Sequence, residues 1–274
     1  MHTEDIFQAA LKAAGLTESP KDSGIAVPKD GITKAAFGVD IDTSEVMLAR
    51  QLGCECVITH HPSGRQRVEM YQVMDDQIRR MVQAGVPINK AQKALAKRKN
   101  QVERSNHVTN YDRAVHSAEL LDMGFMSIHS PADYLAEAKV QQFLDERFAD
   151  KPETRLQEVV DALLEIPEYQ KSASQPKIRL GSPDSYAGRI FVAMAGGTSG
   201  GADVYKAYFE AGVGTMVLMH VPEDVLEAVT EQNIGNIIIA GHMASDSVGI
   251  NQIIAAIEQL GIEVIRMSGV IKPC

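Results

Sequence analysis

The segment Glu55 to Gly64, ECVITHHPSG, is the most informative part of the sequence for predicting the fold. Its apolar run contains three successive β-branched residues, VIT, which is typical of a short buried strand. Pro62 and Gly64 then end the strand. In an open α/β sheet the carboxyl end of a strand borders the ligand crevice. The sequence therefore places His60 and His61 where ligands bind.

Two adjacent neutral imidazoles at such a position can bind a transition metal. Neighbouring residues on a regular strand point to opposite faces, so both rings reach one site only if the backbone is already turning, as Pro62 indicates. The alternative is that one histidine bonds a backbone carbonyl and the other is solvated. Cys54 and Cys56 stand behind the histidines along the chain, and we expect them to be buried thiols rather than ligands.

Strands and helices alternate on both sides of this motif, which favours a parallel or mixed sheet covered by helices. Before it, residues 35–39 predict a strand, and Asp42 or Thr43 is expected to cap the following helix. Asp40 or Asp42 is the alternative candidate for supporting the histidine site. After the motif we expect helices at 68–82, 90–104, 114–123, 131–148 and 154–165.

The second half of the chain repeats the alternation. Strands are predicted at 189–194, 215–219, 236–240 and 263–270, with helices at 204–211, 222–232 and 247–260. The glycine-rich turn AGGTSGGAD follows the first of these strands and can present backbone N–H groups to an anion. It lacks the pattern of a P-loop or a dinucleotide fingerprint. We predict an N-terminal α/β half at 1–130, a helical bridge or insertion at 131–188 and a C-terminal α/β half at 189–274.

Another histidine follows a predicted strand in the C-terminal half. His242 lies at the carboxyl end of the strand at 236–240, and Asp246 lies four residues on, so an imidazole and a carboxylate can converge on one point. The alternative is that Ser245 or Asp246 caps the next helix while His242 bonds a backbone carbonyl.

Composition limits the classes of function. The 274 residues carry a net charge of -9, which gives no general electrostatic basis for binding nucleic acid or an anionic membrane. A basic helix at 90–104 is a local exception that can attract an anionic substrate or contact another subunit. Three cysteines, no leader-like start and no membrane-length apolar run favour a reducing cytoplasm.

The order of the motifs resembles the Nif-three-like family, which includes the type 2 homologues of GTP cyclohydrolase I. The matching residues are His60-His61, the segment Thr109-Asn110-Tyr111-Asp112, and His242 with Asp246. The resemblance implies two similar α/β domains with mixed sheets, and homo-oligomers that are commonly hexamers. It also implies two divalent ions, zinc, iron or manganese, held by His60, His61, Asp112, His242 and Asp246. Asp246 stands where the family usually has glutamate.

The leading hypothesis is a metal-dependent hydrolase that uses a metal-activated water on a nucleotide-like or phosphorylated, anionic small molecule. His107, His116 and His220 are the candidates for general acid or base. The alternative is a metal-binding assembly or sensing protein without turnover. A third hypothesis is a nucleotide-binding protein that uses AGGTSGG without a metal.

Overall fold

A computed structural model describes residues 1–273 of the chain. These residues form two compact units, each built from segments that are far apart in the sequence. The first unit comprises Met1–Val73, Val102–Ala136 and Asp246–Lys272. The second comprises Met74–Gln101, Glu137–Ser245 and Pro273. The units are thus interleaved along the chain, whereas the predicted division into 1–130, 131–188 and 189–274 follows the chain in order.

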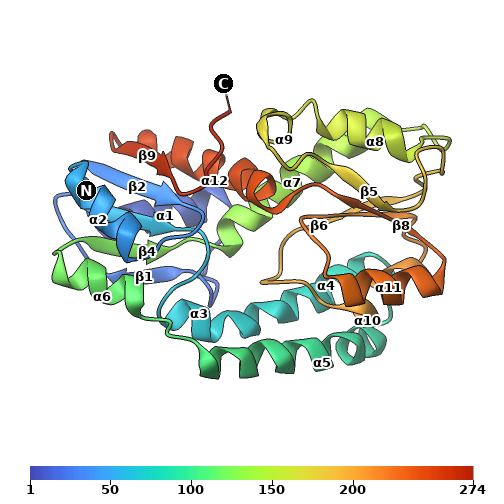
Figure 1. The fold of residues 1–274 in the computed structure, drawn as a ribbon, viewed down its shortest axis with the longest axis horizontal. Coiled ribbons are helices and arrows are strands. Elements are labelled where there is room, and N and C mark those ends of the chain that lie inside the picture. The colour runs from blue at the N-terminus through green and yellow to red at the C-terminus, as the bar shows by residue number, and fades with distance from the viewer. Residues whose placement is uncertain (274) are drawn as a thin grey trace. The chain divides into compact units, whose positions relative to one another are not determined.

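The first unit contains a five-stranded sheet with the strand order β1-β4-β3-β2-β9 (Figure 1). Its strands are β1 (Gly24–Val27), β2 (Lys34–Gly38), β3 (Cys56–Thr59), β4 (Gly124–Ser127) and β9 (Glu263–Met267). Strands β4, β3, β2 and β9 are parallel, and β1 is an antiparallel edge strand. The carboxyl ends of the parallel strands therefore meet at one edge of the sheet.

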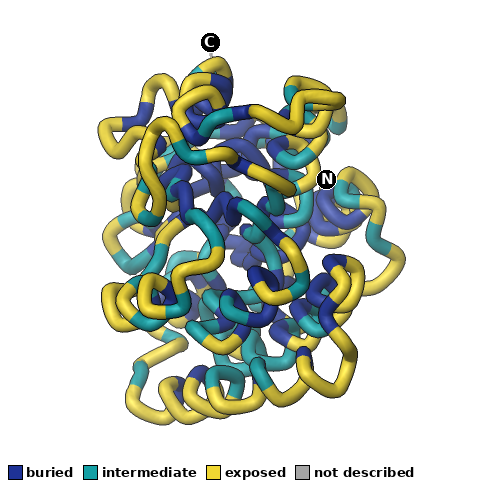
Figure 2. Tube along the Cα trace, turned by 90° about the vertical axis from the view of Figure 1, so that its right-hand side faces the viewer, coloured by how far each residue is buried: buried dark blue, intermediate teal, exposed yellow. Residues whose placement is uncertain are grey.

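Helices cover both faces of this sheet. On one face, α1 (Thr3–Ala13) and α12 (His242–Glu258) form an apolar core with side chains such as Ile58. On the other face, α2 (Thr43–Gln51) and α6 (Arg113–Leu120) pack around side chains such as Val57. Because both faces are covered, every residue of β3 and β4 is buried. Figure 2 shows buried segments of the chain in dark blue in the interior and exposed segments in yellow around them.

The second unit contains a four-stranded sheet with the order β5-β8-β7-β6. Its strands are β5 (Lys177–Leu180), β6 (Ile190–Ala193), β7 (Thr215–Leu218) and β8 (Asn236–Ile239). Strands β6, β7 and β8 are parallel, and β5 pairs antiparallel with β8. Each sheet thus consists of parallel strands and one antiparallel edge strand. This confirms the predicted α/β fold with two mixed sheets.

The remaining helices include those expected at 90–104, 131–148 and 154–165. They are α3 (Arg65–Glu69), α4 (Asp76–Gln83), α5 (Ile88–Ser105), α7 (Ser130–Phe148), α8 (Leu156–Leu163), α9 (Pro167–Lys171), α10 (Ala202–Glu210) and α11 (Glu223–Gln232), with 3-10 helices η1 (Met70–Asp75) and η2 (Asn106–Val108). Within residues 1–273, none of the helices combines the length and apolar composition that a membrane crossing requires.

Three sequence predictions about the elements were wrong. The strand expected at 263–270 was assigned to the C-terminal half, but β9 pairs with β2 in the sheet of the first unit. The sequence reading missed β1, β4 and β5; of these, β1 and β5 are short edge strands within polar, proline-containing segments. Helix α12 begins at His242, so Ser245 and Asp246 lie inside the helix and neither caps it.

Candidate metal centre

Strand β3 delivers the two histidines of the motif to the carboxyl edge of its sheet. The N–H groups of His60 and His61 bond the carbonyls of Gly38 and Val39, both at 2.9 Å, so the strand pairing continues past the last residue of β3. The Thr59 hydroxyl donates to the carbonyl of His61 at 2.9 Å and stabilises the turn. The His60 and His61 ring centroids are 5.1 Å apart, so both rings stay near one point.

The neighbouring strand β4 delivers two more polar side chains to the same edge. His129 lies two residues after the end of β4, and Asp133 lies one turn later in α7. The ring centroids of His129 and His60 are 4.8 Å apart. Both His129 and Asp133 are buried. The parallel pairing of β3 with β4 therefore brings residues nearly 70 positions apart in the chain into one cluster.

Asp246 of α12 completes the cluster in the first unit. Nε2 of His60 lies 3.4 Å from Oδ1 of Asp133 and 3.5 Å from Oδ1 of Asp246. Nε2 of His61 lies 3.7 Å from Oδ2 of Asp246. Ligand atoms of His60, His61 and His129, and those of His60, Asp133 and Asp246, lie within 4.8 Å of one another. Each of these sets can hold a metal ion.

Outer partners orient all three rings in the same way. Nδ1 of His60 lies 3.2 Å from the carbonyl oxygen of Ile128, which can only accept a hydrogen bond. Nδ1 of His61 lies 2.7 Å from Asp40. Nδ1 of His129 lies 2.7 Å from buried Asp22. With its Nδ1 proton committed to such a partner, a neutral imidazole offers the Nε2 lone pair to a metal, as in many metal sites.

Burial and charge oppose each other at these groups. Burial disfavours protonation of His60, but the nearby carboxylates of Asp246 and Asp133 outweigh it and raise its pKa above the usual range. For His129, burial likewise works against protonation, yet Asp133 and Asp22 raise its pKa to about 9. Burial raises the pKa of Asp133 to about 6. Without a metal, bound protons therefore balance the negative charge of the carboxylates. A metal cation can balance the same charge, so metal binding must release these protons.

Two buried atoms of the cluster test whether these residues suit a metal. Nε2 of His60 and Oδ1 of Asp133 have no hydrogen-bond partner among residues 1–273, although they face each other. The carbonyl of Ile128 takes the other ring proton of His60, so in the neutral ring two lone-pair atoms confront each other in a buried space. That arrangement is unfavourable without a cation or an added proton. The donor set, imidazole nitrogen and carboxylate oxygen, fits a divalent transition metal.

Four of the other residues predicted from sequence, Asp112, His107, His116 and His220, belong to none of the candidate ligand groups found among residues 1–273. Asp112 directly precedes α6, and the cluster groups found among residues 1–273 do not include it. His107 and His116 are exposed in the first unit. His220 belongs to the second unit, where its ring centroid is 4.8 Å from that of His242. His242 is the first residue of α12, one helical turn before Asp246.

Sequence reasoning missed His129, Asp133 and Asp22 as site residues. A signal for His129 was available in the apolar segment GFMSI at 124–128, which was not predicted as a strand. The spacing from His129 to Asp133 also equals that from His242 to Asp246. Asp22 lies in a loop far from either motif and carries no local signal. Of the supporting roles left open, Asp42 caps α2 through the N–H of Thr43, and Asp40 bonds His61.

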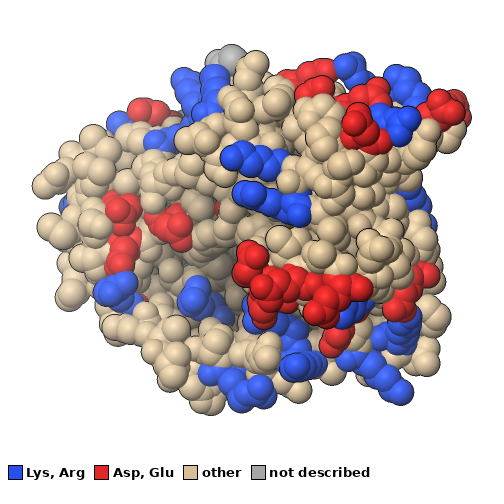
Figure 3. Space-filling view, turned by 45° about the vertical axis from the view of Figure 1, so that its right-hand side comes forward, with Lys and Arg blue, Asp and Glu red and all other residues tan. Residues whose placement is uncertain are grey.

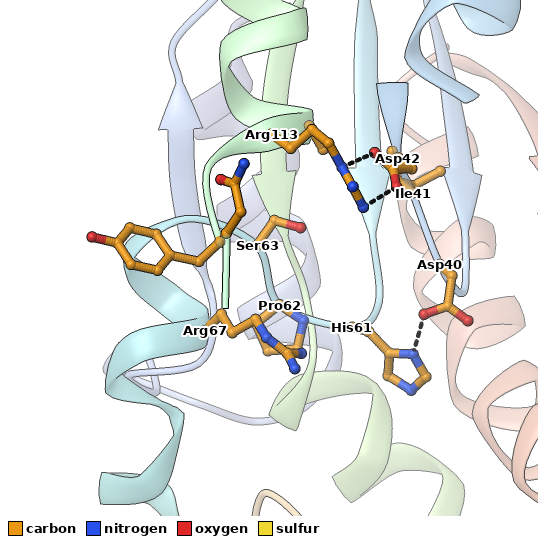
Figure 4. A pocket seen from close by; sticks show the side chains of 11 residues that line it. Asp40, Ile41, Asp42, His61, Pro62, Ser63, Arg67 and Arg113 are labelled. Atoms are coloured by element: carbon orange, nitrogen blue, oxygen red, sulfur yellow. Dashed lines mark hydrogen bonds and ion pairs between the residues drawn. The ribbon is translucent and has the colours of Figure 1, made fainter. Parts of the chain in front are cut away.

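A pocket of about 150 Å³ opens beside His61 (Figure 4). Two arginines line it, and they differ in their hydrogen bonds and ion pairs. Arg113 is paired with Asp42, whereas Arg67 forms no hydrogen bond or ion pair with the rest of residues 1–273. In Figure 4, Arg67 lies beside Pro62 at the same end of the pocket as His61. The pocket thus combines a candidate metal ligand, His61, with a cation, Arg67, that has no such partner among residues 1–273.

The fold and the buried cluster define an α/β protein with two mixed sheets whose histidines and carboxylates can hold a metal ion. The structure is similar to that of a NIF3 superfamily protein from Sphaerobacter thermophilus, with 34% sequence identity, 98% of each chain covered and a TM-score of 0.94. The chain belongs to the NIF3 superfamily, which confirms the resemblance found in the sequence.

More distant structures share the fold alone. They include HcgD from Methanocaldococcus jannaschii, at 14% identity, 97% coverage of each chain and a TM-score of 0.62. Another is TTHA1606 from Thermus thermophilus, at 16% identity, 100% and 99% coverage and a TM-score of 0.59. No protein-family model matches the sequence, and no curated protein matches it.

Proposed function

We propose that this protein is a metal-dependent hydrolase that binds two divalent ions and acts on a phosphorylated or nucleotide-like small molecule. The proposal rests on one observation: the buried atom Nε2 of His60 lies 3.4 Å from a carboxylate oxygen of Asp133 and 3.5 Å from one of Asp246. Metal-free, this arrangement is unfavourable, and proteins keep such buried charge where function requires it.

The proposed ligands come from three elements of the first unit. His60 and His61 follow β3, His129 and Asp133 follow β4, and Asp246 comes from α12. We retain two further ligands as proposals on the family resemblance: Asp112, and His242 by its position one turn before Asp246. Zinc, iron and manganese all suit this donor set.

A bound pair of divalent metal ions would supply Lewis acidity and lower the pKa of a coordinated water toward neutrality. The chain's own groups hold and orient the reactants. Asp40 fixes the ring of His61 through Nδ1, and the buried side chains of Asp133 and His129 exclude bulk water from the inner part of the cluster. Arg67 is placed to bind an anionic group of a substrate that enters beside His61. General acid or base roles for His107, His116 and His220 stay predictions.

The alternative function is metal binding without turnover, for assembly or sensing. A catalytic site keeps a coordination position open for water or substrate, whereas a structural site is closed by protein ligands. The accessible ring of His61, about a quarter of which is exposed, and the adjoining pocket favour the open, catalytic arrangement.

Metal content tests the site itself. Protein purified without chelator or affinity metal, and reconstituted with zinc, iron or manganese, is expected to bind roughly two ions per chain. His60→Ala and Asp133→Asn should each lose most of the metal, and His116→Ala, an exposed histidine, serves as the matched control. Wild-type protein that binds no metal, or cluster variants that bind as much as the control, would contradict the proposal.

A hydrolysis screen tests the reaction. Metal-loaded wild-type protein is offered nucleoside phosphates and sugar phosphates while product release is followed. Arg67→Gln should raise KM for an anionic substrate without changing metal content. Arg65→Gln on the same helix is the control, because Arg65 is exposed and pairs with Glu69. Metal binding without hydrolysis of any phosphorylated substrate would favour the non-catalytic alternative.

A further inference from the structure

The second unit contains a larger cavity that the proposed hydrolase site does not use. Its volume is about 410 Å³, within the range usual for small-molecule sites. It is lined by the middle of α5, by the glycine-rich turn at Ser199–Gly201, by the first residues of α10 and by one side of α11. This is the turn, AGGTSGG, that the sequence marked for anion binding.

The turn is built with its carbonyls facing the protein interior. Buried Gln77 donates through Nε2 to the carbonyls of Gly196 and Thr198, at 2.7 and 2.6 Å. A Cβ on Gly200 would lie 2.3 Å from Oε1 of Gln77, so a side chain at that position would displace the glutamine. Arg98 donates through Nε to the carbonyl of Ser199 at 3.2 Å. These contacts fix the backbone that borders the cavity.

The cavity carries more positive than negative side chains. Its lining includes three cations, Lys97, Arg98 and Lys206, and two carboxylates, Asp203 and Asp224. Neither lysine ammonium forms an ion pair with a carboxylate of residues 1–273, and the two carboxylates form none either. Figure 3 shows Lys and Arg side chains along the lower border of this face. Figure 1 draws α5 at the same height in the view.

We infer that this cavity binds a small phosphorylated molecule that also carries hydroxyl groups, such as a sugar phosphate or a nucleoside monophosphate. The two lysines and Arg98 suit the phosphate, since ammonium and guanidinium groups form the strongest hydrogen bonds to it. Asp203 and Asp224 suit the hydroxyls, because ionised carboxylates only accept hydrogen bonds. A simple inorganic anion would leave most of the cavity and both carboxylates unused.

The inference is independent of the hydrolase proposal, because all its residues belong to the second unit. Calorimetric titration of the full chain at low salt uses adenosine 5′-monophosphate as the probe and adenosine as the uncharged comparison. We expect the monophosphate to bind at least about tenfold more tightly than adenosine, because only the monophosphate engages the cations.

The double variant Lys97→Ala/Lys206→Ala should weaken binding of the monophosphate by about tenfold or more. Lys93→Ala, an exposed lysine on the same helix that does not line the cavity, should change it less than about twofold. His60→Ala separates the two sites: binding at this cavity survives that substitution, whereas binding at the metal centre does not. Equal affinity for adenosine, an unaffected double variant, or loss of binding in His60→Ala would each overturn the inference.

Discussion

Replacing Gly249 with alanine is expected to destabilise the first unit. A Cβ on Gly249 of α12 would lie 2.0 Å from the carbonyl oxygen of Ala132 in α7, where ordinary contact begins at 3.4 Å. From the difference between these distances, the helices must separate locally by about 1.4 Å. Ala132 precedes Asp133, and Gly249 follows Asp246 by three residues, so the separation also pulls two carboxylates of the metal centre apart.

Two effects of opposite sign decide the size of the change. Alanine is favoured over glycine inside a helix by about 1 kcal/mol. Overpacking costs about 1–3 kcal/mol, and here the obstructing atom is a backbone carbonyl that cannot rotate away. Because the carbonyl is rigid, we expect a cost at the upper end of this range, about 3 kcal/mol, and hence a net loss of about 2 kcal/mol. This corresponds to a fall in Tm of roughly 4–8 °C.

Thermal and urea unfolding of the metal-free protein, followed by circular dichroism, measures this loss. Ala255→Gly, at an exposed position of the same helix, provides the control for helix propensity alone and should cost about 1 kcal/mol. Metal content of Gly249→Ala should fall as well. A variant that melts at or above the wild-type temperature would refute the reasoning, since it would mean that propensity outweighs the contact between the helices.

Four further outcomes are expected. Burial opposes ionisation of Glu55, but hydrogen bonds from the N–H groups of Lys34 and Thr33 outweigh it and lower the pKa of Glu55 below 4.5. The ionised carboxylate therefore stabilises the fold above pH 4.5, and this stabilisation is lost as the pH falls through the lower, folded-state pKa. Glu55→Gln should therefore flatten the acid side of a Tm-against-pH curve, and an unchanged curve would count against this role. Gln77→Ala removes the side-chain donor from the carbonyls of Gly196 and Thr198 and should cost about 1–3 kcal/mol in urea unfolding. A loss near zero would show that the glycine-rich turn does not need this contact. Chelation of the metal-loaded protein should lower the free energy of unfolding, by about 2.7 kcal/mol where free metal had been at 100 times its Kd. An unshifted Tm on chelation would argue against the metal centre. Acidification through the pH range in which histidines titrate should also release the metal.

Local signals predicted the parts of the site that lie next to strands. His60 and His61 stand after an apolar β-branched run that ends at proline, so their position at the carboxyl edge of a sheet follows from local sequence. The alternation of strands and helices likewise predicted the α/β class. These features depend on residues close together in the chain, which is why sequence alone reveals them.

Features that depend on distant pairing could not be predicted in the same way. Residues 263–270 are predicted as a strand, but only the fold shows that the observed strand, β9, pairs with β2. Asp22 joins His129 across more than a hundred residues, through a loop with no periodic pattern. Each contact arises because another element brings the partner close, so neither segment carries the information alone.

The interleaving of the two units has a consequence for protein synthesis. A ribosome releases residues 1–73 early, but the β2 edge of their sheet stays open until residues 263–267 emerge. Asp246 also comes from this late segment, whereas the sheet of the second unit is complete once residue 239 has emerged. A nascent chain can therefore form its second sheet before its first, and an exposed parallel edge in that interval is a point at which misfolding competes with folding. Metal bound through Asp246 would then report that synthesis has passed residue 246 and that the start of this late segment has joined the earlier residues of the first unit.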